Sequence, residues 1–285
     1  MNTQPFPDPP TDGIHFWVIE AAHWCRREGM TPGEAVERIQ SYDGNLRRHL
    51  QPREAADAVE RAYAVKVDKS IRMERKVELP PWNSVETARI SDQSGTTVVD
   101  ITVKSPAADP QMILPQEILS ALFPDPEGLL CVGKSAYDFQ TSALRDHTDL
   151  WRSQFVVPAY MIAPTGITQD GKTSAHCKAN TGTRRYIVCD FDSPPPAEHP
   201  AIIEHLAKFR PLALALSSGG KSLHAWFPVT ENANDDRLFW RLCIALGADP
   251  ALYRNPSQFV RMPNGTRNNG KKQHCIYFNP GAAAL

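Results

Sequence analysis

The chain of 285 residues has no apolar run that is long enough to cross a lipid bilayer. Its first residues, from Met1 to Pro10, have neither the basic start nor the apolar stretch of a secretory signal. These absences argue against a membrane protein and predict a cytoplasmic one. Hydrophobic residues make up 41% of the chain and charged residues 22%, which is the balance of an ordinary globular protein.

Paired cysteines of the zinc-binding type are also missing. The six cysteines are scattered along the chain without a CxxC pair, and most of them lie in apolar runs. This pattern predicts buried, reduced thiols and argues against a zinc knuckle.

The net charge of −1 conceals an uneven distribution. Residues 151–285 carry 15 Lys and Arg against 9 Asp and Glu, whereas the first 150 residues have an excess of acids. A local positive field suits a partner that bears phosphates, although a solvated basic loop would have the same composition. The stretch from Pro250 to Lys272 has no acid and five basic residues, namely Arg254, Arg261, Arg267, Lys271 and Lys272.

Short helices are predicted from about residue 13 to residue 75. His15 to Glu28 has a helical pattern that ends at Gly29, and Thr31 to Glu34 has the form of a capping box with proline at the first helical position. A third helix is predicted from Pro52 to Ala64. Helices this short need one another to bury their apolar faces, so we expect a small helical domain over residues 1–76.

Strands and helices alternate from Val77 on, which predicts an α+β domain over residues 77–285. After residue 184 the expected order is strand, helix, two strands, helix and strand, as in a ferredoxin-like or RNA-recognition-type unit. The elements expected before it are a strand at Thr96–Val103, a helix at Leu114–Phe123, a strand at Gly128–Val132, a helix at Ser142–Gln154 and an exposed loop at Gly166–Gly182. Those expected after it are strands at Arg185–Asp192, Leu212–Ser217, Ser222–Val229 and Gln273–Phe278 and helices at Ala197–Phe209 and Asp235–Leu246.

Two aspartates end the first strand of this unit. Asp190 and Asp192 are two residues apart, so in a strand their side chains project from the same face. Neighbouring carboxylates repel each other unless a cation or a proton neutralises them, and Mg²⁺ prefers oxygen ligands. The pair is therefore a candidate metal platform, although it also suits a strand end, since a proline-rich turn follows.

A glycine turn joins the next two strands. Its sequence from Ser218 to His224 reads Ser-Gly-Gly-Lys-Ser-Leu-His. The segment is not a P-loop, because Ala215 stands where the first glycine would be and a strand follows where a helix is required. Glycines let main-chain N–H groups approach phosphate oxygens, and Lys221 and His224 add positive donors. A hairpin turn with a core histidine accounts for His224 alone.

A third segment begins at Asp249 and continues through Tyr253 to Arg261. The acid follows a helix and precedes Pro250, so it also suits the N-cap of another helix.

The three segments in this order resemble the three-motif signature of the archaeo-eukaryotic primases, including primase-polymerases of bacterial, phage and plasmid type. The specific part of the resemblance covers Arg185 to Lys272. It implies a primase core made of an α/β subdomain and a ferredoxin-like subdomain. The helices from Trp24 to Ala55 faintly resemble the accessory domain of plasmid and phage primases, which usually follows the core instead of preceding it.

The resemblance also implies roles for individual residues. Asp190, Asp192 and Asp249 would be catalytic metal ligands for two Mg²⁺ or Mn²⁺ ions. His224 would contact the phosphates of the incoming nucleotide. The other nucleotide-binding residues would be Gly220, Lys221, Ser222, Arg261, Lys271 and Lys272.

The activity implied is template-directed nucleotidyl transfer, with the metal ions activating a 3′-hydroxyl and stabilising the leaving pyrophosphate. Its partners would be a single-stranded DNA template and nucleoside or deoxynucleoside triphosphates, and a replicative helicase is a further partner that the resemblance suggests. Two alternatives remain open at this point. One is a non-catalytic replication initiator that binds nucleic acid, and the other is a metal-dependent nuclease. Trp151, Tyr160 and Trp226 are candidate aromatic contacts for the template.

Overall fold

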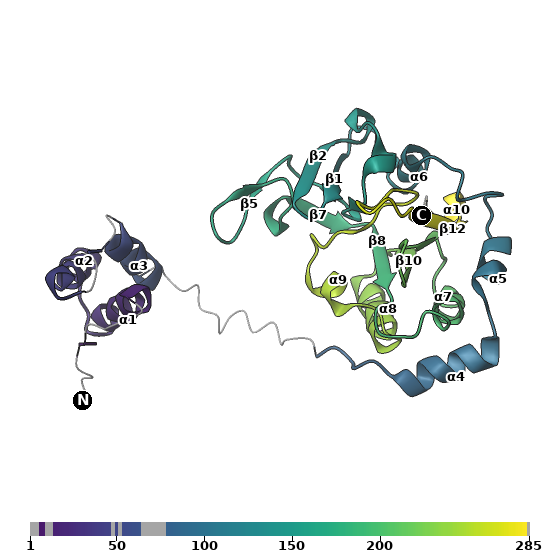
Figure 1. The fold of residues 1–285 in the computed structure, drawn as a ribbon. Helices are drawn as coiled ribbons and strands as arrows, with labels where there is room; N and C mark the ends of the chain where they lie inside the picture. Colours follow the sequence, from purple (N-terminus) through teal and green to yellow (C-terminus); the bar gives the residue numbers. More distant parts are fainter. Residues whose placement is uncertain (1–5, 9–13, 47–48, 51–52, 64–77, 284–285) are drawn as a thin grey trace. The chain divides into compact units, whose positions relative to one another are not determined.

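The computed structural model describes residues 6–8, 14–46, 49–50, 53–63 and 78–283. The chain divides into two compact units, Met1–Val77 and Glu78–Leu285, which are described separately (Figure 1). The domain boundary expected between residues 76 and 77 lies outside the described residues, and so do both ends of the helix expected at Pro52–Ala64.

The smaller unit consists of short helices around one apolar core. They are α1 (Ile14–Arg27), α2 (Pro32–Gln40), α3 (Glu54–Tyr63) and a 3-10 turn, η1 (Asp43–Asn45). The capping box expected at Thr31 is confirmed, because the Glu34 carboxylate accepts the Thr31 main-chain N–H at 2.7 Å and the Glu34 N–H is donated to the Thr31 hydroxyl. Each helix alone is too short to be stable in water, and their buried apolar faces supply the stability.

The larger unit contains two antiparallel sheets and a separate hairpin. The first sheet has six strands, in which β1 pairs with β2 along one edge and with β3 and β4 along the other. Its strands are β1 (Leu129–Ser135), β2 (Asp138–Ala143), β3 (Phe155–Val156), β4 (Ala159–Met161), β7 (Thr181–Arg184) and β11 (Val260–Arg261). The hairpin consists of β5 (Gly166–Ile167) and β6 (Thr173–Ser174), in the segment expected to be a loop.

The second sheet has four strands in the order β12-β9-β10-β8. They are β8 (Tyr186–Asp190), β9 (Leu214–Ser217), β10 (Leu223–Pro228) and β12 (His274–Phe278). With the helices α7 (His199–Ala207) and α8 (Ala233–Ala245) they follow the expected order of elements, with α9 (Pro250–Arg254) and β11 inserted before the last strand. The pairing differs from a ferredoxin-like sheet, because β12 pairs with the second strand of the unit, β9, and not with the first. The larger unit is therefore α+β, and the strand order of its second sheet is not that of a ferredoxin-like fold.

The remaining helices are α4 (Ser84–Ser94), α5 (Val98–Val103), α6 (Pro115–Leu122) and α10 (Pro280–Ala283), and short 3-10 turns lie at Leu144–Asp146, Leu150–Arg152 and Lys178–Asn180. Helix α7 packs against β10 and α8 packs against β8 (Figure 1). The main core contains Ile118 and Phe123 from the α6 region together with Val188 and Trp226 from the second sheet.

The strand expected at Thr96–Val103 is wrong, since Val98–Val103 forms α5. The Thr97 hydroxyl and the Asp100 carboxylate form a capping box, which satisfies main-chain N–H groups at the start of the helix. Ile101 is buried, whereas Val99 and Val103 are exposed. A local cap and one buried contact have overridden the β-propensity of valine and threonine.

The helix expected at Ser142–Gln154 is also wrong. Ser142 and Ala143 end β2 by pairing with Leu130 and Leu129 of β1, and the rest of the segment forms two 3-10 turns. Asp149 adopts a left-handed conformation with φ of 54°, which a regular helix does not allow. The pairing with β1 is a long-range effect that a local helical pattern does not contain.

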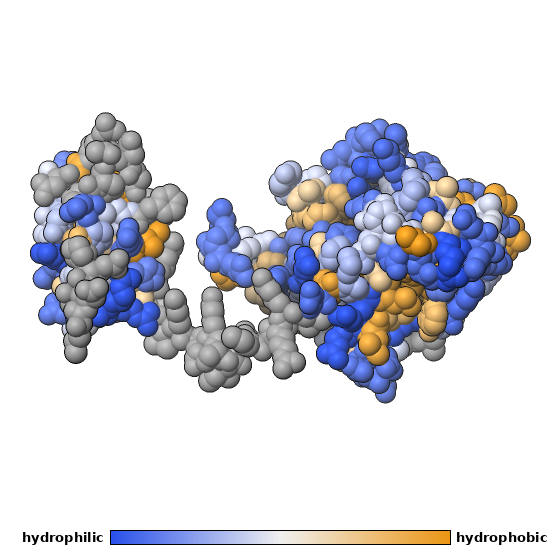
Figure 2. Space-filling view, turned by 90° about the horizontal axis from the view of Figure 1, so that it is seen from below, coloured by the Kyte–Doolittle hydropathy of each residue, from blue (hydrophilic) through white to orange (hydrophobic). Residues whose placement is uncertain are grey.

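None of the helices in the described ranges is long and apolar enough to cross a membrane. All six cysteines are buried and unpaired, as expected. The face of the larger unit seen in Figure 2 is mainly hydrophilic, with smaller hydrophobic patches between.

Candidate functional site

Asp190 stands at the end of β8, directly opposite His224 of β10. The antiparallel register pairs these two residues, so both side chains leave the same face of the sheet. Nε2 of His224 lies 3.2 Å from Oδ1 of Asp190, although the two atoms are not aligned for a hydrogen bond. The rest of β8 is apolar and buried, so the strand is anchored in the core and carries Asp190 to its polar end.

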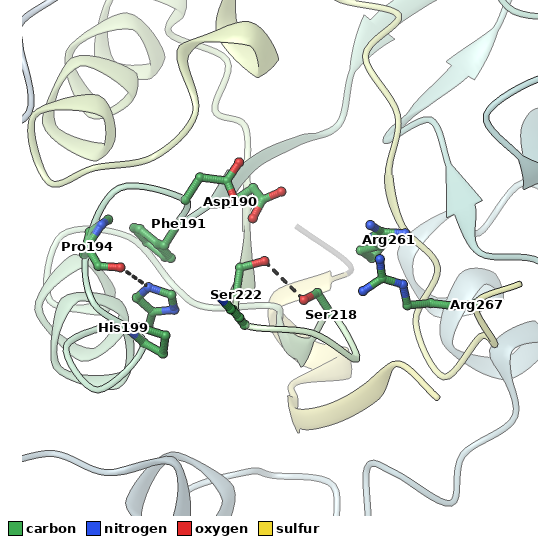
Figure 3. Close-up of a pocket in the computed structure, with 11 residues that line it drawn as sticks. Asp190, Phe191, Pro194, His199, Ser218, Ser222, Arg261 and Arg267 are labelled. Atoms are coloured by element: carbon green, nitrogen blue, oxygen red, sulfur yellow. Dashed lines mark hydrogen bonds between the residues drawn. The ribbon is translucent and has the colours of Figure 1, made fainter. Parts of the chain in front are cut away.

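A cavity of about 340 Å³ opens at this end of the sheet. Asp190 and Asp192 line it, and the arginines Arg261 and Arg267 lie across it from Asp190 (Figure 3). Asp190 is the last residue of β8 and Asp192 follows it by two positions, whereas Arg261 belongs to β11 of the other sheet. The cavity therefore lies where the two sheets meet. Its other lining residues are Phe191, Pro194, Pro196, His199, Ser218, Lys221 and Ser222.

The carboxylates are held in an environment that disfavours their charge. Burial raises the pKa of Asp190 to about 6, while the Ser222 hydroxyl and the Arg261 guanidinium partly offset this effect. Burial also raises the pKa of Asp192, and the charges of Asp190 and Asp249 raise it further. Two carboxylates that are both disfavoured in their charged form gain stability from a cation placed between them.

The opposite wall of the cavity is basic. The Arg261 guanidinium lies over the ring of Phe155, 4.8 Å from its centroid, which fixes the direction of the side chain. Burial lowers the pKa of Arg261, and the charge of Arg267 lowers it further. Because burial and the charge of Arg267 disfavour the charged form of Arg261, a bound anion would stabilise it. Lys221 adds a third cation to the same cavity.

The glycine turn between β9 and β10 carries Ser218, Lys221 and Ser222 into the cavity. The Ser218 N–H is donated to the Ser222 carbonyl at 3.0 Å, and the Ser222 hydroxyl contacts the Ser218 hydroxyl at 3.2 Å (Figure 3). Gly219 has φ of +70°, and a Cβ there would lie 2.6 Å from the Lys272 carbonyl oxygen. Glycine is thus required both by the backbone conformation and by the close approach of residues 267–272.

His199 joins the turn after Asp192 to the start of β10. Its Nε2 atom donates to the Pro194 carbonyl at 2.9 Å, and its Nδ1 atom accepts the Leu223 N–H at 3.3 Å. These two bonds require the neutral ring with its proton on Nε2. Burial lowers the pKa of His199, which is consistent with that form. The turn after Asp192 is in this way fastened to the start of β10.

Five of the residues expected at the site do not line the cavity, and one of these, Gly220, lies at its edge. His224 is 2% exposed and lies behind Asp190, and burial lowers its pKa to about 3. Asp249 accepts the Ala251 N–H at 2.8 Å as the N-cap of α9, while its own N–H is donated to the Asp190 carbonyl at 2.9 Å. Lys271 and Lys272 are exposed on the turn that follows Arg267.

Gly220 lies next to the cavity, since a Cβ there would come 2.9 Å from Nη1 of Arg267. The structure therefore brings Asp190, Asp192, Lys221, Ser222 and Arg261 into one cavity and places Gly220 at its edge. It leaves Asp249 close enough for its charge to raise the pKa of Asp190 and Asp192.

A divalent cation fits the acidic wall. Oδ1 of Asp190 is buried without a hydrogen-bond partner, and Asp192 opens into the same cavity. Mg²⁺ is commonly held by one or two carboxylates together with phosphate oxygens of the substrate and water. Among the side chains that the structure describes, no group of three or more His, Cys, Asp or Glu residues is arranged to hold a metal, so the protein would supply two carboxylates in this arrangement.

Arg267, Ser218 and His199 are lining residues that sequence reasoning did not assign to the site. Arg267 is one of the five basic residues between Pro250 and Lys272, but only the fold turns it toward the cavity. Ser218 was part of the glycine segment. No local pattern marks His199, because its partners lie in the turn after Asp192 and at the start of β10.

No family model, curated protein or solved structure matches this chain. Its function is therefore inferred from its own residues and their geometry.

Proposed function

We propose that this chain is a metal-dependent nucleotidyl transferase that copies a single-stranded DNA template, in the manner of a primase-polymerase. One observation carries the proposal: Asp190 and Asp192 share a cavity with Lys221, Arg261 and Arg267. Carboxylates on one wall suit a divalent cation, and cations on the other suit the phosphates of a nucleoside triphosphate. Such a cavity could bind both the divalent cation and the triphosphate that nucleotidyl transfer requires.

Each wall has its own part in the proposed reaction. Asp190 and Asp192 would hold Mg²⁺ or Mn²⁺, which when bound neutralises the triphosphate and favours attack by a 3′-hydroxyl. Arg261, Arg267 and Lys221 would bind the β- and γ-phosphates and offset the charge that develops on the leaving pyrophosphate. The glycine turn would bring main-chain N–H groups close to the phosphate oxygens.

His224 supports this arrangement indirectly. Because it is buried and its Nε2 atom lies 3.2 Å from Oδ1 of Asp190, it would pack against that carboxylate and not contact the triphosphate. Asp249 would cap α9 and add negative potential, without a direct bond to the substrate. The cavity would thus resemble that of a primase while using two of the three acids directly.

The proposal is tested by strand extension. Purified protein is incubated with a primed and an unprimed single-stranded template, labelled nucleotides and Mg²⁺ or Mn²⁺. We expect Asp190→Asn and Asp192→Asn each to lower extension by at least about 100-fold, since each removes a ligand of the charge-stabilising cation. Asp92→Asn on the exposed face of α4 is the matched control and should retain full activity.

A nuclease would behave differently in the same experiment. It would shorten the template and show no saturable triphosphate binding, because it has no use for three cations around a leaving pyrophosphate. Cleavage without extension by the wild type would therefore replace the proposal with the nuclease, and template binding with neither reaction would replace it with a non-catalytic initiator.

A further inference from the structure

Three segments of the larger unit, each with several exposed residues, meet beside the cavity, and together they are called the rim: residues 133–138, 149–154 and 265–272. A main-chain hydrogen bond of 2.9 Å from Gln154 to Gly133 joins the first two, and one of 3.3 Å from Thr266 to Ser153 joins the last two. Arg267 of the third segment lines the cavity. The rim is therefore continuous with the candidate site.

The rim exposes two aromatic side chains, Tyr137 and Trp151. Tyr137 is 99% exposed in the turn between β1 and β2, and Trp151 is 50% exposed in the 3-10 turn before β3. The Arg152 guanidinium lies over the Trp151 ring, 4.6 Å from its centroid. An exposed ring beside an arginine can stack on a base while the cation reaches a phosphate.

The charge of the rim suits a polyanion. Its three segments contain five cations, Lys134, Arg152, Arg267, Lys271 and Lys272, against two carboxylates, Asp138 and Asp149. Asp149 lies 4.0 Å from Arg152, and the four other cations are balanced in the rim only by the single carboxylate of Asp138. Lys134, Lys271 and Lys272 are exposed, so their ammonium groups are accessible to a ligand.

We propose that the rim binds a single strand of nucleic acid and leads it to the cavity, with Tyr137 and Trp151 stacked on bases and Lys134, Arg152, Lys271 and Lys272 near phosphates. A single strand is favoured over a duplex because the faces of unpaired bases are free to stack, whereas those of a duplex are covered. The proposal rests on the proposed function, since it names the path of the template. Of the aromatic residues expected to contact the template, it retains Trp151 and rejects Trp226, which is fully buried.

The test measures binding without catalysis. Fluorescence anisotropy follows a labelled twenty-nucleotide oligomer with the full chain in EDTA and without nucleotide, using oligo(dT), oligo(U) and a duplex of equal length. We expect tighter binding of a single strand than of the duplex. Tyr137→Ala and Trp151→Ala should each weaken binding of the single strand by about 5- to 100-fold, as loss of one stacked base does elsewhere.

The basic residues have a separate signature. The double variant Lys271→Ala/Lys272→Ala should reduce the slope of log affinity against log salt by about 1.4, because each phosphate contact on a single strand contributes about 0.7. Tyr137→Ala should leave that slope unchanged. The matched controls are Phe209→Ala and Lys208→Ala, which remove an exposed ring and an exposed cation at the end of α7, outside the rim.

Each outcome decides the matter. Tighter binding of the duplex, or rim variants that bind like the two controls, would overturn the rim as the binding surface. Comparison of oligo(dT) with oligo(U) identifies which kind of strand it takes. Because no nucleotide or metal is present, a chain that binds as expected but never extends a primer would contradict the proposed function and leave the rim intact, whereas extension with unaffected rim variants would do the reverse.

Discussion

At the scale of the residue, the cavity depends on contacts that lie outside it. The Arg261 guanidinium is directed by Phe155, Asp190 is backed by His224, and the turn after Asp192 is fastened by His199. Each of these partners is wholly or partly buried, so it has little freedom to rearrange. Conservative changes at such positions are expected to alter the site without opening the fold.

Gly219 gives the sharpest test of this kind. Gly219→Ala adds a Cβ at a positive φ and 2.6 Å from the Lys272 carbonyl, so the turn or the rim must move. We expect the free energy of unfolding to fall by about 2 kcal/mol or more, from backbone strain and the clash together, and triphosphate affinity to fall with it. Urea unfolding and a nucleotide titration provide the two measurements.

Gly171→Ala is the control for Gly219. Gly171 also has a positive φ, +78°, but no atom lies within 4 Å of its added Cβ. It should cost only the backbone strain of about 1 kcal/mol and leave nucleotide binding unchanged. Equal losses for the two variants would mean that the close approach to Lys272 contributes nothing.

Substitutions at Asp249 distinguish its role as a helix cap from a role in catalysis. Asparagine is as good an N-cap as aspartate, so Asp249→Asn should keep the stability within about 0.5 kcal/mol, whereas Asp249→Ala should lose about 1 kcal/mol. Because its carboxylate does not line the cavity, we expect Asp249→Asn to lower extension by less than about tenfold. A loss as large as that of Asp190→Asn would instead make Asp249 a direct metal ligand.

At the scale of the element, Glu204 joins three helices. From α7 it accepts hydrogen bonds from Thr96 and, at 2.7 Å, from Ser94, and it pairs with Lys104 just after α5. The hydrogen bond from Lys104 lowers the pKa of Glu204 most, and the hydrogen bonds from the Thr96 and Ser94 hydroxyls and the charge of Lys104 lower it further. Together they bring it from its usual 4.5 to about 2. The network holds α4 and α5 against α7, although the valines of α5 are mostly exposed.

The lowered pKa predicts how stability depends on pH. Because the pKa of Glu204 is lower in the folded chain than in the unfolded one, its contribution is fully present above about pH 5 and is lost as the pH falls toward 2. Glu204→Gln should lower stability at pH 7 by about 1 kcal/mol, since the group is partly exposed, and should make the acid branch less steep. Thermal unfolding between pH 7 and pH 3 measures both effects. Parallel curves for variant and wild type would contradict the assignment.

At the scale of the whole molecule, each unit has its own hydrophobic core. Among the described residues, the core of the first unit contains only residues up to 63, and the clusters of the second contain only residues from 90 onward. The candidate site belongs entirely to the second unit.

The second unit is expected to fold and act by itself. A fragment of residues 78–285 should unfold cooperatively, within about 2 °C of the matching transition in the full chain, because its core is complete. It should also retain triphosphate binding. Calorimetry of the fragment and the full chain makes the comparison, and a fragment that is unfolded at 25 °C would show that the first unit is needed for stability.

Local patterns were sufficient for several elements. The cap at Thr31, the helix that begins at Pro115 and the strand that ends at Asp190 all depend on residues a few positions apart, and each was predicted correctly within a few positions. The shared face of Asp190 and His224, by contrast, depends on the register between β8 and β10, which are separated along the chain by α7 and β9.

Only the tertiary structure decided the rest. The segment that begins at Ser142 pairs with β1 through its first two residues and does not form a helix. Strand β12 pairs with β9 and not with β8. Both outcomes are settled by contacts between distant parts of the chain. The same holds for the site. The sequence by itself determined which acids and cations the protein has near its strand ends, but the packing of two sheets determined that Arg261 and Arg267 face Asp190 while His224 lies buried behind it.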